Sequence, residues 1–308
     1  MNQFSPSEAG LEGFRVAREN RRAFGLWVLF SFAVSLLGAL VTVSMPAEVR
    51  TAMETLQSDT TPDASTFLHA MIAMAPLLVF GLAIQCVMAA AVYRIILRHD
   101  DTRWGYLRLG RDELRLMGLT LIYLGLAIAG LVGVTIAAAL LAAIAGMGGQ
   151  GVGAFVGVAA ELFAIGLVIY VAIRLSLAPV ITFAERRFAI FDSWPLTRGA
   201  FWRLLGAYVL ALFCMIVVTI VTLVLFTAVA GIVVLLAGGQ MEDVSRMFDP
   251  DQTSLAAYFN PLMLAYMLVG SLITALYYAV IAAPGAWVYQ RLHGDAPAAP
   301  LSRPADHG

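Results

Sequence analysis

The sequence predicts an all-α polytopic membrane protein in which six transmembrane helices form three helical hairpins, with amphipathic helices at the cytoplasmic interface. Three observations predict this class. Apolar residues make up 61% of the 308 residues and charged residues only 13%, whereas a soluble domain is about 45–50% apolar and about 25% charged. The apolar residues are gathered in six long blocks, and the basic residues are concentrated in alternate connections between the blocks.

Each apolar block is long enough to cross the bilayer as a helix. About 20 residues at roughly 1.5 Å per residue span the hydrocarbon, and a helix is required because lipid offers no partner for free backbone groups. The N-terminal block exceeds the roughly 7–15 residues of a signal-peptide core, so we expect it to be retained as the first span. The expected spans are residues 23–43, 68–93, 117–145, 153–173, 206–236 and 261–288.

The basic residues indicate the orientation. All nineteen are arginine, and seventeen of them fall in the N-terminal flank, the connections after spans two and four, and the C-terminal tail. The other connections carry only Arg50 and Arg246, together with eight acidic residues. Because basic segments stay in the cytoplasm, we expect both termini to be cytoplasmic. The tryptophans lie on the same side and predict an aromatic belt there: Trp27, Trp104, Trp194, Trp202 and Trp287.

These assignments divide the chain into three parts. Residues 1–22 are expected to form a cytoplasmic N-terminal flank, residues 23–289 the six-helix transmembrane domain, and residues 290–308 a disordered cytoplasmic tail.

A pattern before the odd-numbered spans predicts an internal repeat. The segments RVARENRRAFGLWVLF, RLGRDELRLMGLTLIY and TRGAFWRLLGAYVLAL align on Gly25, Gly118 and Gly206, and arginine stands three residues before each glycine. One interpretation is a unit used three times, made of an arginine-bearing segment, a hairpin and an arginine at its end. The other is that every odd span needs basic residues at its cytoplasmic end.

The segments that precede spans three and five have the composition of helices lying on the membrane surface. Asp192 or Ser193 can cap such a helix, with Pro195 in its first turn. Arginine on the polar face suits anionic lipid, although it also serves to set topology. Tryptophan and arginine at this interface supply the candidate residues for anionic phospholipid: Arg115, Arg174, Trp194, Arg198, Trp202 and Arg203.

Two charged residues near or within the spans have more than one interpretation. Glu161 follows the small residues Gly153 and Gly157, which favour close helix packing, so we expect it to face a neighbouring helix or a cavity. It can serve as a proton relay or ion site, or it can form an interhelical hydrogen bond or lie in a hydrated position. Arg174 is either buried where Pro179 breaks the helix or extends to the interface.

No catalytic or metal-binding motif is recognisable. The four histidines have no ligand spacing, and HExxH, GxSxG, a Walker lysine and CxxC are all missing from the sequence. Cys86 and Cys214 lie inside apolar blocks and are expected to be packing residues. We therefore expect no catalysis, no cofactor and no metal. The arginine-rich segments adjoin the spans, so the bilayer explains them better than nucleic acid does.

Residues 176–211 resemble a signature of bacterial multi-pass membrane proteins of unknown function. These proteins are grouped around the membrane domain attached to some glycerophosphodiester phosphodiesterases. The resemblance implies a six-helix membrane module without an assigned activity, and we accordingly expect the membrane to be the bacterial inner membrane. The phosphodiesterase barrel of some relatives is missing from this sequence, so hydrolysis is not expected. The matching features are Pro179, Glu185, Ser193-Trp194, Arg198 and Phe201-Trp202-Arg203.

These observations favour a non-catalytic membrane module that organises anionic phospholipid or a membrane protein partner. The alternative is a transporter or channel for a small solute or lipid, using Glu161 and the spans that Pro76 and Pro284 should kink. A lipid-modifying enzyme has the least support. A transporter should contain a polar cavity that reaches Glu161, whereas a scaffold should have a dry core and a basic cytoplasmic surface.

Overall fold

A computed structural model describes residues 5–46, 49–51, 64–98, 103–147, 149–240, 242, 244, 248 and 254–293. These residues are helical apart from their connections, and no strand occurs among them. Six helices are long and apolar enough to cross a membrane, which confirms the predicted number of spans. They are α2 (Arg21–Val43), α4 (Ala64–Leu97), α5 (Arg111–Gly146), α6 (Gln150–Leu175), α9 (Phe201–Leu236) and α12 (Pro261–His293).

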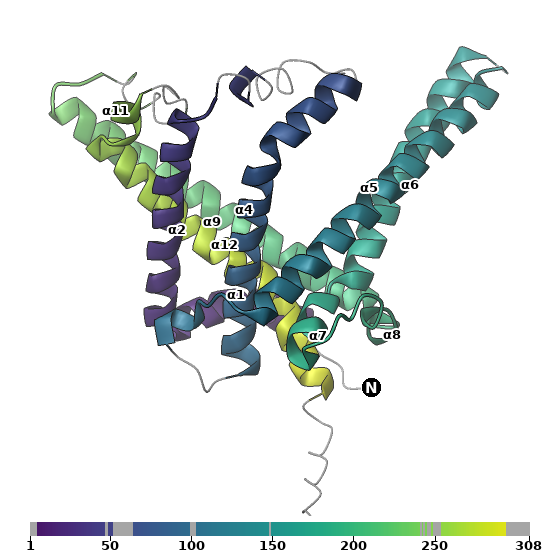
Figure 1. Cartoon of the computed structure of the whole chain (residues 1–308), viewed down its shortest axis with the longest axis horizontal. Helices are drawn as coiled ribbons and strands as arrows, with labels where there is room; N and C mark the ends of the chain where they lie inside the picture. Colours follow the sequence, from purple (N-terminus) through teal and green to yellow (C-terminus); the bar gives the residue numbers. More distant parts are fainter. Residues whose placement is uncertain are drawn as a thin grey trace, which may run out of the picture.

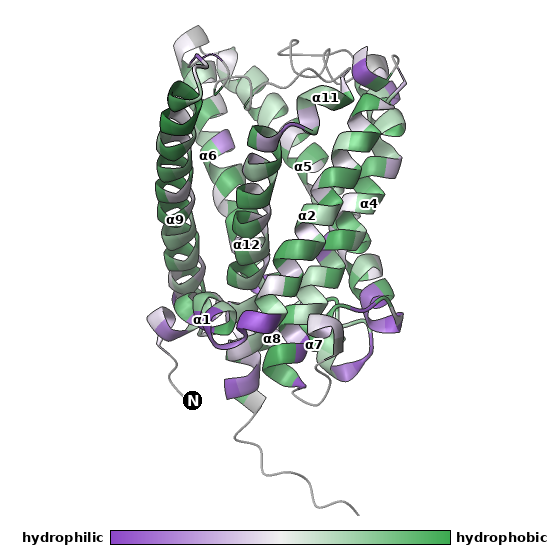
Figure 2. Ribbon diagram, turned by 90° about the vertical axis from the view of Figure 1, so that its left-hand side faces the viewer, coloured by the Kyte–Doolittle hydropathy of each residue, from purple (hydrophilic) through white to green (hydrophobic). Residues whose placement is uncertain are grey.

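Shorter helical segments gather mainly at one end of the long helices (Figures 1 and 2). They are α1 (Pro6–Glu19), the 3-10 turn η1 (Arg103–Tyr106), α7 (Ala178–Glu185) and α8 (Ser193–Thr197), while α11 (Leu255–Tyr258) lies at the opposite end. We call the end formed by α1, η1, α7, α8 and the adjoining turns of the long helices the base. The first described residues and the C-terminal end of α12 both lie there (Figure 1).

A left-handed turn in η1 positions one of the buried tryptophans. Trp104, Gly105 and Tyr106 have φ values of 52°, 62° and 67°, a conformation that favours glycine. The turn brings the Gly105 carbonyl to Trp27, whose indole nitrogen donates a hydrogen bond of 2.7 Å. Trp27 is buried in the base beside this turn, and Trp287 of α12 is buried there as well. The predicted aromatic belt is wrong for these two residues, because they pack between helices; Trp104, Trp194 and Trp202 are exposed.

The helices are packed closely at the base and diverge away from it. The largest buried cluster joins α4, α7, α9 and α12 through Met88, Phe183, Leu204 and Trp287. A smaller cluster at the opposite end joins α2, α9 and α12 around Ala39, Ala230 and Met263. The α5–α6 pair leans away from α4 toward that end, and α4 changes direction in its outer half (Figure 1).

The long helices do not pair in three equivalent ways. α5 packs on α6 and α9 packs on α12, whereas α2 and α4 both pack mainly against α12. The aligned glycines also have different surroundings: a side chain at Gly25 would meet open space, one at Gly118 would meet Phe188, and one at Gly206 would approach Pro6. The threefold repeat therefore stays a prediction.

The N-terminal flank is a packed helix. Gly10 and Gly13 of α1 lie against the backbones of α9 and α12, so that a Cβ on Gly13 would come 2.4 Å from the Val280 Cα. Glycine permits this close approach because it has no side chain. Before span five, the short helix α8 follows Asp192 and contains Pro195, where the sequence suggested that a helix begins, although the Asp192 side chain forms no cap hydrogen bond. The rest of the segments before spans three and five forms no separate surface helix among the described residues, since Arg111 and Phe201 begin the long helices α5 and α9 directly. At the other terminus α12 continues to His293, and residues 294–308 lie outside the described residues.

Candidate functional site

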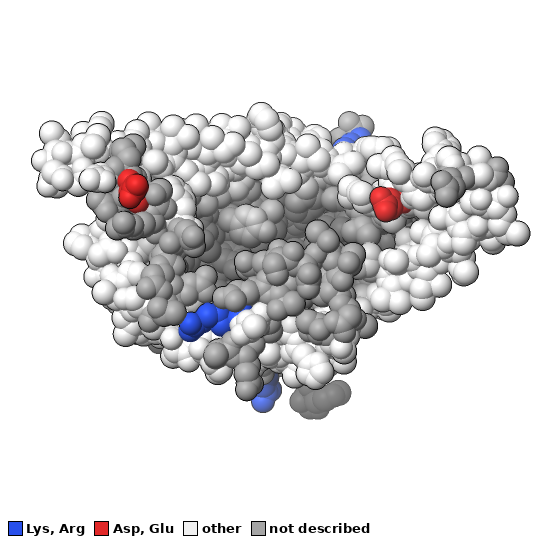
Figure 3. Space-filling view, turned by 90° about the horizontal axis from the view of Figure 1, so that it is seen from above, with Lys and Arg blue, Asp and Glu red and all other residues white. Residues whose placement is uncertain are grey.

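The described arginines lie at the base, with the exception of Arg50. Figure 3 views the opposite end, where uncharged residues cover most of the described surface. Arg246, Arg303 and most of the acidic residues of the outer connections lie outside the described residues. The arginine pattern of the sequence thus corresponds to a physical clustering at one end of the helices.

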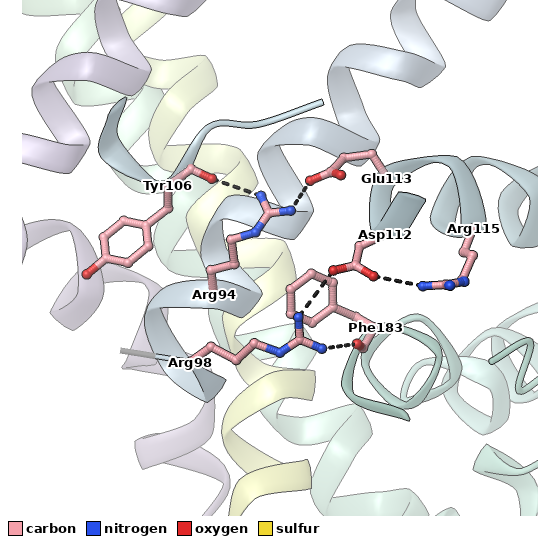
Figure 4. A network of polar contacts seen from close by, with 7 residues as sticks. All are labelled: Arg94, Arg98, Tyr106, Asp112, Glu113, Arg115 and Phe183. Carbon is pink, nitrogen blue, oxygen red and sulfur yellow. Dashed lines mark hydrogen bonds and ion pairs between the residues drawn. The ribbon is translucent and has the colours of Figure 1, made fainter. Parts of the chain in front are cut away.

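Arg94 and Glu113 form an ion pair inside the base. Arg94 donates to the Glu113 carboxylate and, at 2.9 Å, to the carbonyl of Tyr106 (Figure 4). The exposed fractions of the Arg94 and Glu113 side chains are 8% and 5%. A pair this deeply buried costs desolvation, and removing one partner leaves an uncompensated charge. The contacts therefore fix α4, η1 and α5 relative to one another.

A second group of charges lies beside this pair (Figure 4). Asp112 accepts hydrogen bonds from Arg98 at 3.2 Å and from Arg115 at 2.9 Å. Arg98 also donates to the carbonyl of Phe183 at 2.8 Å, and its guanidinium carbon lies 4.6 Å from the centre of the Phe183 ring. Arg115, one of the lipid candidates, is thus engaged with an acid of its own helix.

Sequence reasoning missed the role of Arg94, Arg98 and Glu113 in this network. Arg94 and Arg98 were interpreted as topology signals, because every arginine at this end fits the same rule. The available signal was the position of Asp112 and Glu113 between Arg111 and Arg115 in one short segment. Nothing in that pattern tells which arginine each acid pairs with.

Arg174 lies at the end of α6 between two aromatic rings. Its guanidinium carbon is 5.1 Å from the ring centre of Tyr170 and 5.4 Å from that of Trp194. Its Nε donates to the Tyr170 hydroxyl at 3.1 Å. Ser193 donates its hydroxyl to the Arg174 carbonyl, which ties α8 to the end of α6. Arg174 is half-buried and packs against aromatic rings. The sequence left open whether Arg174 is buried or extends to the interface, and the observed arrangement lies between these two possibilities.

Two further aromatic residues, Phe201 and Trp202, extend the group of rings around Arg174. Phe201 lies 5.3 Å from Tyr170 and 5.2 Å from Trp202, measured between ring centres, and Trp202 is 77% exposed. Arg198 is exposed and Arg203 is half-buried, and within the described part of the chain neither side chain makes an ion pair or hydrogen bond. We call this set the Arg174 cluster: Tyr170, Arg174, Trp194, Arg198, Phe201, Trp202 and Arg203.

Glu161 is exposed on α6 and does not face another helix of this chain. The expectation that it faces a neighbouring helix or a cavity is wrong within the described chain. Gly153 lies against α5, where an added Cβ would come 3.0 Å from Gly146. The half-buried stripe of α6 continues through Ala160 and Ala164. Successive helical residues are rotated by about 100°, which turns Glu161 away from α5.

A cavity of about 340 Å³ lies between α4, α5, α6, α9 and α12. Its lining includes the uncharged polar residues Gln85, Thr120, Ser176, Tyr208, Tyr277 and Tyr278. Glu161 is not among the lining residues. The described part of the chain therefore contains a cavity within the spans, but it is not the cavity that the transporter hypothesis requires.

The base also contains a buried acid outside the spans. The Glu12 side chain lies where α1 meets the end of α12, and Arg15 donates to it at 3.0 Å. Burial raises the pKa of Glu12 above its ordinary value of 4.5, and the charge of Arg15 opposes this effect.

Among the described residues no cluster of three or more histidine, cysteine or acidic side chains could hold a metal ion.

No family model matches the chain, and the comparisons with curated proteins and with solved structures gave no match.

Proposed function

We propose that this protein is a non-catalytic module of the bacterial inner membrane that organises anionic phospholipid at its base. In this proposal the base faces the cytoplasm, in agreement with the positive-inside rule. The observation that carries the proposal is the Arg174 cluster. It combines exposed tryptophans with three arginines that form no ion pair with an acid among the described residues.

The chemistry of the cluster suits a phosphate headgroup. Guanidinium groups bind phosphate oxygens in pairs, and each basic residue near an anionic membrane surface contributes about 1 kcal/mol. Indole rings are favoured at headgroup depth. Arg115 is not part of this proposed site, because Asp112 already holds its guanidinium.

Native mass spectrometry of the purified protein tests the lipid proposal. The double variant Arg198→Gln/Arg203→Gln should lose co-purifying phosphatidylglycerol or cardiolipin while remaining inserted in the membrane. The matched control is Arg18→Gln/Arg22→Gln, which removes the same charge from exposed positions of the base. Equal lipid retention in the two variants, or no retained lipid in the unmodified protein, would refute the proposal.

Cysteine labelling tests the orientation independently. In a background without Cys86 and Cys214, a cysteine placed at residue 59 or 249 should react with a membrane-impermeant reagent from the periplasm. A cysteine at residue 103 or 303 should not react. Labelling of residue 103 from outside would reverse the proposed orientation.

A second candidate function is association with a membrane protein through α6. It is favoured by the exposure of Glu161 on a helix whose surrounding side chains are apolar. An ionisable residue at membrane depth is costly against lipid, and such residues normally face other protein or water. Crosslinking from Val158 and Leu162, which flank Glu161 on α6 and are exposed, would capture such a partner in native membranes.

A further inference from the structure

The cavity between α4, α5, α6, α9 and α12 lies within the spans and is partly open at the outer surface of these helices. Gln85 and Tyr277 are exposed at its opening, whereas Cys86, Tyr93 and Leu116 are buried along its inner wall. Gln85 precedes Arg94 by nine residues on α4, which corresponds to roughly 14 Å along the helix. The cavity is thus inside the spans, in the half of the bundle nearer the base.

The polar groups at the opening have no hydrogen-bond partner within the described part of the chain. Among the described residues, neither the Gln85 amide nor the hydroxyl groups of Tyr277 and Tyr278 form a hydrogen bond. An amide without a partner costs free energy in an apolar medium. At this depth bulk water does not reach a side-facing surface. These groups therefore point to a ligand that supplies hydrogen-bonding atoms.

The lining also limits the charge and shape of that ligand. No arginine, aspartate or glutamate lines the cavity, so a phosphate or ammonium group would be desolvated without a counter-charge. The volume of about 340 Å³ falls within the range of small-molecule sites. The rings of Tyr277 and Tyr278, whose centres are 5.7 Å apart, present aromatic surface to the ligand.

We propose that this cavity binds an uncharged lipid, whose carbonyl- or hydroxyl-bearing head lies among Gln85, Thr120 and the tyrosines while its apolar tail remains in the bilayer. The proposal goes beyond the lipid role of the Arg174 cluster, because the two sites differ in the charge of the headgroup that they accept. A quinone ring and a diacylglycerol head share the required chemistry. The aromatic rings of Tyr277 and Tyr278 at the opening favour the quinone, because a quinone ring can pack against their faces or edges.

Binding can be measured with the purified full chain in detergent by isothermal titration calorimetry. The two probes are decylubiquinone and dioctanoylglycerol, and dioctanoyl phosphatidylglycerol is the charged comparison. The variant Gln85→Leu/Tyr277→Phe removes two hydrogen-bonding groups at nearly constant shape and should weaken binding of the neutral probe about tenfold. Ala172→Phe, at an exposed position of the lining, should block the opening and abolish binding.

Two controls keep the proposal falsifiable. Ala139→Phe makes the same substitution at an exposed position of α5 outside the cavity lining, and it should leave binding unchanged. The cavity variants should retain the phosphatidylglycerol that the Arg198→Gln/Arg203→Gln variant loses, so failure at one site is distinguishable from failure at the other. The proposal is overturned if neither neutral probe binds to the unmodified protein. It is also overturned if the cavity variants bind the neutral probe as tightly as the unmodified protein does, or if these variants weaken only the binding of phosphatidylglycerol.

Discussion

The base and the α5–α6 pair are both built mainly from helices, yet the surroundings of their side chains differ. At the base, glycines of α1 touch the backbones of α9 and α12, and an ion pair is buried between α4 and α5. From Leu121 to Gly146 no residue of α5 is buried, and the same holds for α6 from Gly151 to Ala172. The long helices of both regions are apolar enough to span a membrane, but the base buries side chains between several helices, whereas the outer parts of α5 and α6 pack mainly on each other.

The largest expected difference between the two regions concerns their glutamates. Glu113→Ala leaves Arg94 buried without its counter-charge, so we expect a loss of about 3–5 kcal/mol in the free energy of unfolding. Glu161→Ala should change it by less than about 0.5 kcal/mol, because Glu161 contacts no other helix of the chain. Unfolding in mixed micelles with increasing dodecyl sulfate, followed by tryptophan fluorescence, measures both values.

A double variant separates the charge from the packing. Replacing both partners in Arg94→Met/Glu113→Leu should recover much of the loss, since no buried charge remains. Comparable destabilisation by Glu113→Ala and Glu161→Ala would contradict the contrast between the base and the α5–α6 pair.

Glycine substitutions sharpen the same comparison with a smaller effect. Gly13→Ala would place a Cβ 2.4 Å from the Val280 Cα, and separating the two helices should cost about 1–3 kcal/mol. Gly133→Ala on α5 meets nothing within 4 Å and should be neutral or stabilising by up to about 1 kcal/mol, because alanine favours the helix. The same unfolding assay measures the change in the free energy of unfolding for both variants. We expect a loss for Gly13→Ala and no loss for Gly133→Ala.

The smallest expected effect is a pH dependence confined to the base. The pKa of Glu12 is raised in the folded state, so the folded protein binds this proton more tightly than the unfolded chain does. The resulting stabilisation is fully present below about pH 4.5 and is lost as the pH rises through the higher folded pKa. The difference in stability between the unmodified protein and Glu12→Gln should change over this interval. A difference that stays constant with pH would show that Glu12 titrates normally.

The sequence by itself determined the number of spans and the end at which the arginines gather. Hydropathy summed over about 20 residues is a local property of the chain, and the six apolar blocks correspond to α2, α4, α5, α6, α9 and α12. The alternation of spans then places alternate connections at the same end of the bundle. The sequence also placed Arg174, Trp194 and Trp202 beside the spans at that end, and their role in binding lipid stays a prediction.

Only the tertiary structure decided which of these side chains are engaged and which are exposed. Arg115 pairs with Asp112, Trp27 is buried against η1, and Glu161 faces away from α5. The network at the base depends on contacts between residues far apart in the sequence, such as Arg98 with Phe183. The rotation of each helix about its axis sets these contacts. A helix with apolar residues on all sides carries little information about that rotation, so it follows from packing between helices.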